Sequence, residues 1–240
     1  LFGGPARRPE DPIGRRERDL AASIQQVIEE AVLRSARTAK DLTDESNLVL
    51  AGGVALNCVA NGRLLREGPF DQIWVQPAAG DAGSALGCAL WATHEVLDLP
   101  RSVVRPDGMK GSYLGPNFEP DDVAAELTEA GRPFTRIPDD AARAARVAEL
   151  IDDGAVVAVF AGRMEFGPRA LGNRSILADA RNPETQRTLN LKVKKREGFR
   201  PFAPAVLAEH ASEWFDLDVP SPYMTLVAQV SASRMLEPAT

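Results

Sequence analysis

Two arginines lie five positions apart in a segment rich in glycine and proline. The segment, FGPRALGNRS at residues 166–175, carries Arg169, Arg174 and Ser175. Guanidinium groups donate paired, planar hydrogen bonds to phosphate oxygens, and a hydroxyl adds a further donor. Glycine and proline favour a turn over a helix here. These residue types predict a stiff turn that binds a polyanion.

The turn lies within a basic island of an acidic protein. Residues 160–205 hold ten Lys and Arg against four Asp and Glu, whereas the whole chain has a formal charge of −6. Such an island is typical of an anion site. The alternative is a solvated helix face, which the neighbouring Gly, Pro and Asn residues disfavour. Further cations of the island are Arg163, Lys194, Arg196 and Arg200.

Two glycine-rich turns each follow an apolar, strand-like run. They are LVLAGGVALN, with Gly52, Gly53 and Asn57, and QPAAGDAGSALG, with Gly80, Asp81, Gly83 and Ser84. Glycine lets the backbone approach a ligand, and a helix N-terminus donates free N–H groups to an anion. Two such turns at the carboxyl ends of neighbouring strands face one crevice. Spacing alone leaves Asp81 as a metal ligand or a helix cap, and favours the cap.

Alternating strands and helices must position these motifs, which predicts an α/β fold. A stretch without apolar periodicity separates two units, so we expect a domain over 1–98, a linker over 99–112 and an α+β domain over 113–240. Apolar patterning predicts helices and strands at the following positions. The helices are 17–39, 57–68, a segment beginning near Ser84, 121–129, 139–152 and 182–195, and the strands are 46–53, 72–77, 154–162, 174–180 and 224–230.

Composition indicates an ordinary globular protein. The 240 residues are 44% hydrophobic and 26% charged, and no apolar run reaches the roughly 18 residues of a membrane span. The sequence shows no signal-peptide pattern. Its two cysteines, Cys58 and Cys88, are expected to be buried thiols. Together these features predict a reducing, cytoplasmic setting. The acidic total disfavours nucleic acid as a partner. The chain lacks a starting Met, so we expect a piece of a longer protein.

Four segments, LAGGVALNCVANGRLL, QPAAGDAGSALG, RMEFGPRALGNRSILADAR and LKVKKREGFRPFAP, resemble the nodulation-protein and antibiotic-biosynthesis family of O-carbamoyltransferases. The resemblance covers essentially the whole chain. It implies that residues 1–98 are the back part of an actin-like ATPase domain similar to the tRNA threonylcarbamoyl-transfer protein. It also implies that residues 113–240 are similar to threonylcarbamoyl-adenylate synthase. The second domain would form carbamoyl-adenylate from ATP and carbamoyl phosphate, and the first would pass the carbamoyl group to a hydroxyl of a small antibiotic or sugar.

The resemblance also implies roles for individual residues. The two glycine turns would contact nucleotide, through Gly52, Gly53, Asn57, Gly80, Asp81, Gly83 and Ser84. Asp81 would ligate a divalent metal such as iron, whose two histidine partners we expect upstream of Leu1, because His94 and His210 are too far apart in sequence. Lys194, Arg196 and Arg169 would be catalytic, and carbamoyl phosphate and ATP with Mg would bind to Arg163, Arg169, Arg174, Ser175, Lys194, Arg196 and Arg200.

Two alternatives stay open at this point. The kinship of both domains also fits a threonylcarbamoyl-adenylate or tRNA-modifying enzyme, although a tRNA partner favours a broad basic face over one compact island. A nucleotide-binding module without turnover is the other. Each of these functions is compatible with a homo-oligomer.

Overall fold

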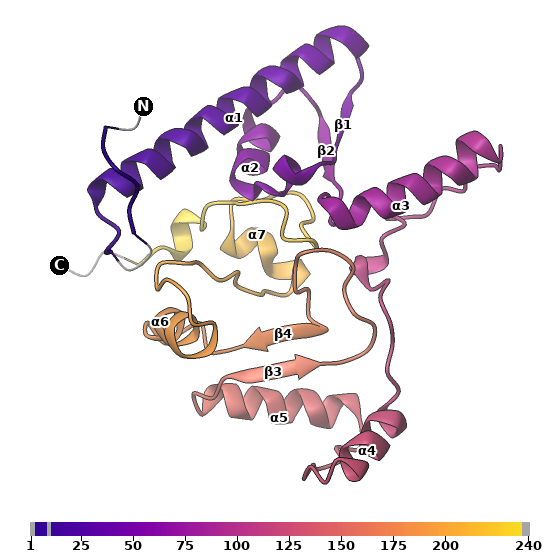
Figure 1. Ribbon diagram of the computed structural model, residues 1–240, viewed down its shortest axis with the longest axis vertical. Helices are drawn as coiled ribbons and strands as arrows, with labels where there is room; N and C mark the ends of the chain where they lie inside the picture. The colour runs from indigo at the N-terminus through magenta and orange to yellow at the C-terminus, as the bar shows by residue number, and fades with distance from the viewer. Residues whose placement is uncertain (1–2, 9–10, 237–240) are drawn as a thin grey trace.

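The computed structural model describes residues 3–8 and 11–236 and contains a small sheet in each half of the chain (Figure 1). In the first, β1 (Asn47–Leu50) pairs in parallel with β2 (Gln72–Val75), with Leu50 opposite Val75. In the second, β3 (Val157–Phe160) pairs antiparallel with β4 (Arg174–Leu177), with Phe160 opposite Arg174. The mixture of strands and helices confirms the α/β class.

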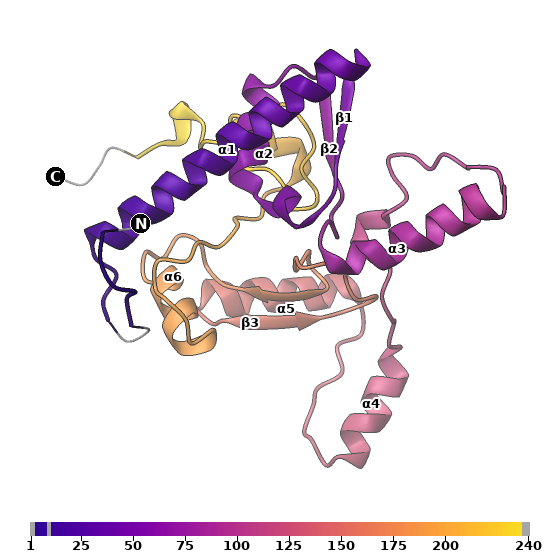
Figure 2. The same cartoon turned by 45° about the horizontal axis from the view of Figure 1, so that its top comes forward.

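Two helices cover the first sheet. They are α1 (Arg15–Thr43) and α2 (Cys58–Glu67), which lie against each other (Figures 1 and 2). Their shared core is Leu33, Ala36, Leu64 and Phe70, all buried. The apolar pattern predicted the helix, which extends beyond 17–39 at both ends, but Leu20, Ile24 and Val27 of the expected apolar face are exposed.

A single arginine links α1 to α2 by ion pairs. The guanidinium of Arg63 lies 3.4 Å from Glu29, 3.0 Å from Glu30 and 3.0 Å from Glu67. Its hydrogen bond to Glu67 raises the pKa of Arg63 against the opposing effect of desolvation, and the bond to Glu30 raises it further. The network ties α2 to α1.

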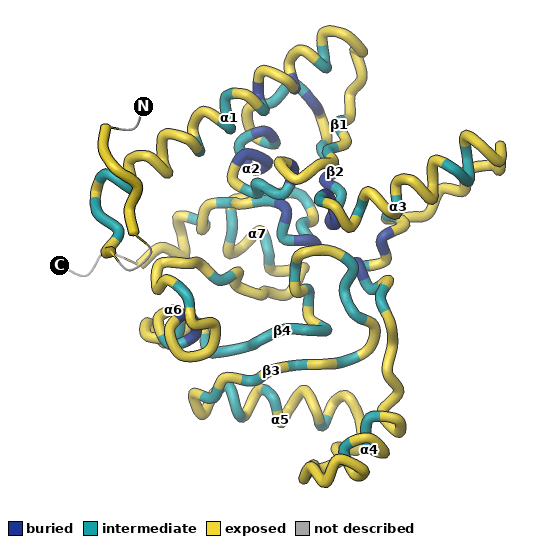
Figure 3. Tube along the Cα trace, viewed as in Figure 1, coloured by how far each residue is buried: buried dark blue, intermediate teal, exposed yellow. Residues whose placement is uncertain are grey.

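Helix α3 (Asp81–Trp91) begins three residues before the predicted start near Ser84 and projects away from the body of the molecule in both views (Figures 1 and 2). It continues as a π-helical turn over Ala92–Val96. No residue of α3 is buried in the described part of the chain (Figure 3). The prediction of a buried Cys88 is therefore wrong: it is exposed, because α3 packs through Leu86 on the cluster of Ala78, Met109 and Tyr223 and its Cys88 side is left uncovered by the described residues. Cys58 is partly buried.

Among the described residues, the second half carries the helices α4, α5, α6 and α7 besides β3 and β4. α4 (Pro120–Glu129) and α5 (Asp140–Asp152) confirm the predicted positions, and α5 lies along β3 (Figure 1). The predicted helix over 182–195 is shorter in the structure, with α6 (Thr185–Thr188) followed by a π-helical turn over Leu189–Val193. A short helix, α7 (Ala211–Trp214), follows an irregular segment. Among the helices that the structure describes, none is long and apolar enough to cross a membrane.

The predicted strand over 224–230 is wrong, because this segment lies along helix α2 in place of a sheet. The backbone N–H of Val227 donates to Cys58 O at 3.2 Å, and Asn61 Nδ2 donates to Thr225 O at 2.9 Å. A Cβ at Gly62 would overlap Val227 O, so only glycine admits the approach. Within the described residues the segment makes one isolated bridge, from Val230 to Phe215.

The two halves share a buried cluster. Ala78, Met109 and Tyr223 form it, and Phe166 and Leu171 pack against it. The Tyr223 hydroxyl donates to the Asp107 carboxylate at 2.9 Å and accepts from Gly111 N at 3.3 Å. Burial raises the pKa of Tyr223, and its hydrogen bond to Asp107 raises it further. The domain boundary at 99–112 stays a prediction.

Candidate functional site

The two glycine turns meet at one edge of the first sheet. Because β1 and β2 are parallel, their carboxyl ends lie together, and Gly52 N donates to Ala79 O at 2.8 Å. Gly52 has φ +99°, a conformation that side chains rarely adopt. A Cβ at Gly52 or Gly53 would meet nothing within 4 Å, so both backbones face open space. The turns lie together as expected, and the crevice between them stays a prediction.

The helices that follow the turns begin in different ways. Asn57 caps α2, its Oδ1 accepting from Ala60 N at 3.0 Å, and its amide also pairs with Gln25 at 2.9 and 3.1 Å. Gly80 is the cap residue of α3, so Asp81 is the first helical residue and the prediction that it caps the helix is wrong. A carboxylate in the first turn interacts favourably with the positive end of the helix dipole, even where it does not cap the helix.

Gly83 and Ser84 occupy the first turn of α3. A Cβ at Gly83 would overlap Ala78 O, so this glycine serves close packing of the helix on its own turn. Ser84 is exposed and lines a wide, shallow apolar hollow on α3 with Gly87, Cys88, Trp91 and Ala92.

The segment 166–175, called the arginine turn below, packs against these glycine turns. A Cβ at Gly167, which has φ +130°, would lie 3.2 Å from Pro77 O and 3.3 Å from Ala78 Cα. Arg169 Nη2 donates to Leu56 O at 3.2 Å, at the end of the first glycine turn. Two motifs that sequence alone could not place together therefore share one location.

The guanidinium of Arg169 keeps an unused donor at this junction. Its Nε–H is buried and has no hydrogen-bond partner among the described residues. A buried charged donor without a partner costs about 1–3 kcal/mol or more. Such a donor is typical of a site that binds an acceptor from outside the chain.

Arg174 and Ser175 serve the loop itself. Arg174 Nη1 donates to Ala161 O at 2.7 Å, Nη2 donates to Gly162 O at 3.1 Å, and the guanidinium lies 3.4 Å from the Phe160 ring centroid. Its Nε–H, like that of Arg169, is buried without a partner among the described residues. Ser175 Oγ accepts from Gly172 N at 2.9 Å. Both side chains thus stabilise the start of β4. Arg163 is exposed and donates to Gly115 O at 2.9 Å.

The remaining predicted cations, which form a separate cluster after α6, are Lys194, Arg196 and Arg200. Buried Asn190 organises it: its Nδ2 donates to Arg200 O at 2.8 Å, and its Oδ1 accepts from Arg196 Nε at 2.7 Å. Arg200 pairs with Glu197 at 2.9 Å, and Lys194 is exposed at the end of the π-helical turn. In the described residues, no hydrogen bond or ion pair joins this cluster to Arg169. The single pocket for all the cations stays a prediction.

Comparisons with known proteins decide the family. The family model described as the carbamoyltransferase N-terminus matches residues 2–90, and the model for the carbamoyltransferase C-terminus matches residues 148–238. The chain belongs to the carbamoyltransferase family.

Relatives of this carbamoyltransferase chain include both nodulation and uncharacterized proteins. It is 54% identical over 96% of its length to an uncharacterized protein of Synechocystis, of which it covers 38%. It is 45% identical over 95% of its length to nodulation protein NolNO of Sinorhizobium fredii, covering 33% of that protein. It is 44% identical over 95% of its length to nodulation protein NolO of Bradyrhizobium diazoefficiens, covering 41% of that protein. The chain thus spans between a third and about two fifths of these relatives.

The metal that the resemblance implies, with two histidine ligands expected upstream of Leu1, stays a prediction. The described residues contain no group of three or more His, Cys, Asp and Glu side chains that could hold an ion. Asp81 is exposed at the start of α3, whereas His94 lies beyond its other end, with Nδ1 2.8 Å from Leu99 O.

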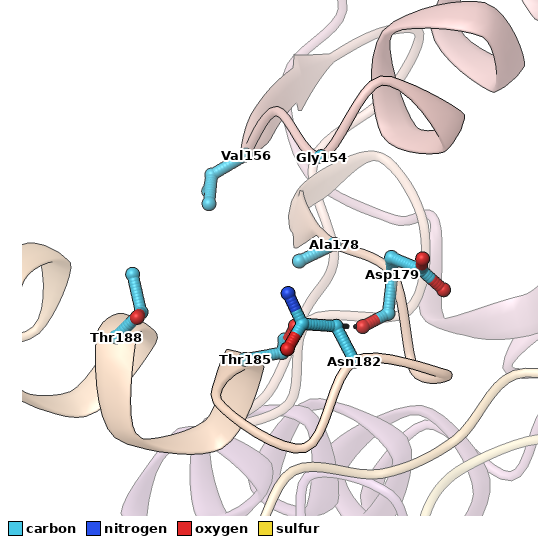
Figure 4. Close-up of a pocket in the computed structure, with 7 residues that line it drawn as sticks. All are labelled: Gly154, Val156, Ala178, Asp179, Asn182, Thr185 and Thr188. Atoms are coloured by element: carbon cyan, nitrogen blue, oxygen red, sulfur yellow. Dashed lines mark hydrogen bonds between the residues drawn. The ribbon is translucent and has the colours of Figure 1, made fainter.

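A small, partly open pocket lies apart from the predicted residues. It has a volume of about 110 Å³ and lies between the ends of β3 and β4 and helix α6 (Figure 4). Thr185 donates to Asp179 O at 2.7 Å across its floor, and Arg181 pairs with the Asp179 carboxylate at 2.8 Å. The other lining residues are Gly154, Val156, Ala178, Asn182 and Thr188.

Two residues that organise the candidate site were missed from sequence. Glu165 Oε1 accepts from three backbone N–H groups of the arginine turn, and Asn190 holds the cluster after α6. For Glu165 there was a signal, since an acidic residue directly precedes a glycine-rich turn whose N–H groups form an anion-binding concavity. For Asn190 the helical pattern gave none.

Proposed function

We propose that this chain is the part of an O-carbamoyltransferase that binds carbamoyl phosphate and ATP. The observation that carries the proposal is the unpaired, buried Nε–H of Arg169 beside the open backbone of Gly52 and Gly53. A guanidinium donor next to backbone that leaves open space suits a phosphate dianion, since each charge-assisted hydrogen bond contributes about 1.5–3 kcal/mol.

The reaction in this proposal makes carbamoyl-adenylate. Water releases phosphate from carbamoyl phosphate, the carbamate oxygen bonds to the α-phosphorus of ATP, and pyrophosphate leaves. Such a step needs alignment and stabilisation of charge on phosphate oxygens more than acid–base help. Arg169 would bind the acyl phosphate, and Lys194, Arg196 and Arg200 would lie against the nucleotide phosphates. Mg would accompany ATP as part of the substrate.

The finer assignment of the two halves is part of the same proposal. We infer that the first half belongs to an actin-like ATPase domain and the second to a domain similar to threonylcarbamoyl-adenylate synthase. Transfer to a hydroxyl of a small acceptor would take place in the first. No step is assigned to a resident metal, because Asp81 lacks partner ligands in the described residues.

Pyrophosphate release tests the proposal. We expect release from ATP that depends on carbamoyl phosphate and falls at least tenfold in Arg169→Ala. Release that is independent of carbamoyl phosphate would contradict the reaction. Tight, salt-sensitive binding of tRNA would favour a tRNA-modifying enzyme in its place.

A further inference from the structure

One carboxylate oxygen gathers the two ends of the arginine turn. Glu165 Oε1 accepts from Leu171 N at 2.8 Å, from Asn173 N at 2.9 Å and from Arg174 N at 3.2 Å. Burial alone would raise the pKa of this partly buried carboxyl, but the backbone N–H groups outweigh burial and lower it. The charged carboxylate therefore holds the start of the arginine turn against its end, so that residues 165–174 form a closed loop.

Other contacts fix both ends of that loop against Ser112 and Tyr113. Phe166 N donates to Ser112 O at 2.7 Å, and the Tyr113 hydroxyl donates to Leu171 O at 2.6 Å. The part between these anchors, residues 167–170, is the part that reaches the glycine turns. Its backbone path depends on Glu165 and on these two residues.

Arg169 itself has little to hold its direction. It makes one hydrogen bond across the junction, to Leu56 O at 3.2 Å, and its buried Nε–H has no partner among the described residues. A side chain held so weakly points where its backbone directs it. The loop conformation therefore decides where the guanidinium meets a ligand.

We propose that Glu165 is a positioning residue for Arg169, closing the loop so that the guanidinium meets a phosphate dianion at the glycine turns. The ligand rests on the proposed function, in which the dianion is carbamoyl phosphate. Glu165 acts through the backbone of the loop and Arg169 acts on the ligand, so the two side chains form one functional unit.

A double-mutant cycle on carbamoyl phosphate binding by the 240-residue chain tests this coupling. We expect Glu165→Ala and Arg169→Ala each to weaken binding about tenfold or more, and the double variant to bind as weakly as Arg169→Ala alone. Glu165→Gln, whose amide oxygen still accepts, should restore most of the affinity. The matched control is Glu129→Gln at the exposed end of α4, which should bind as wild type does. Losses that multiply in the double variant would overturn the proposal.

A ligand-free measurement separates this inference from the proposed function. In Glu165→Ala we expect faster hydrogen exchange at the amides of Leu171, Asn173 and Arg174, and a shifted NMR signal of the Arg169 Nε–H. Glu165→Gln should show neither change in full. If both observables stay as in wild type, Glu165 does not position Arg169. If they change as expected but wild type binds no carbamoyl phosphate, the proposed function and its ligand fail while the loop-closing role stands.

Discussion

The guanidinium of Arg169 donates to the main-chain carbonyl of Leu56 across 3.2 Å and so joins the arginine turn of one half to the glycine turn of the other. Next to this contact, Gly52 N donates to Ala79 O and ties the two glycine turns together. Three motifs from distant parts of the sequence therefore meet at one junction. The proposed anion site lies at this junction, between the halves.

Packing of the segment 224–230 on α2 leads to a prediction for Gly62. Changing Gly62→Ala should lower the free energy of unfolding by about 1–3 kcal/mol, because the new Cβ overlaps Val227 O and the backbone must shift. Urea unfolding measures the change. The matched control is Gly87→Ala on α3, where a Cβ meets nothing within 4 Å. That variant should be more stable by about 0.5–1 kcal/mol from helix propensity. Equal effects at the two positions would contradict the observed packing.

Burial of Asn190 predicts a large effect from its removal. Changing Asn190→Ala should cost about 2–3 kcal/mol of unfolding free energy, since Arg200 O and Arg196 Nε lose their buried partner. Amide exchange over residues 196–200 should rise as well. Asn117→Ala, at an exposed position that pairs with Glu119 on the surface, should change stability by less than about 0.5 kcal/mol. An Asn190→Ala chain as stable as this control would show that the cluster after α6 is not held as described.

The pKa of Glu165 predicts how acid affects stability. Because the carboxyl has a lowered pKa in the folded chain, its contribution is present above its unfolded pKa of about 4.3 and is lost as pH falls through the folded pKa. Wild type should therefore lose more unfolding free energy than Glu165→Gln between about pH 6 and about pH 3. Denaturant titrations at both pH values measure the difference. A steeper acid loss in the Gln variant would reverse the sign and contradict the backbone hydrogen bonds.

Elements with local signals were predictable from the sequence. The helical pattern of α1, the bounds of α2 and the glycines after β1 and β2 each depend on signals within a few residues. The segment 224–230 has a strand-like composition, but its partner is a helix surface that no local pattern reveals. Helix α3 has an apolar composition typical of a covered helix, yet it is exposed in the described chain, which explains the wrong prediction for Cys88.

The candidate site was predictable in its residue types and not in its geometry. Charge and turn chemistry correctly predicted that Arg169 lies on a turn. They also correctly predicted that the glycine turns follow two neighbouring strands. Their meeting depends on tertiary contacts at Leu56 and Ala78, which are far from Arg169 in sequence. Arg174 has the same local signal as Arg169, but its guanidinium binds the carbonyls of Ala161 and Gly162.

Calorimetric titration of the chain with carbamoyl phosphate tests the central claim most directly. We predict that wild type binds the compound, that Arg169→Ala weakens binding at least tenfold, and that Arg187→Ala, which removes an exposed arginine of α6, leaves it unchanged. Wild-type affinity in Arg169→Ala, or an equal loss in both variants, would contradict a phosphate site at the junction of the two halves.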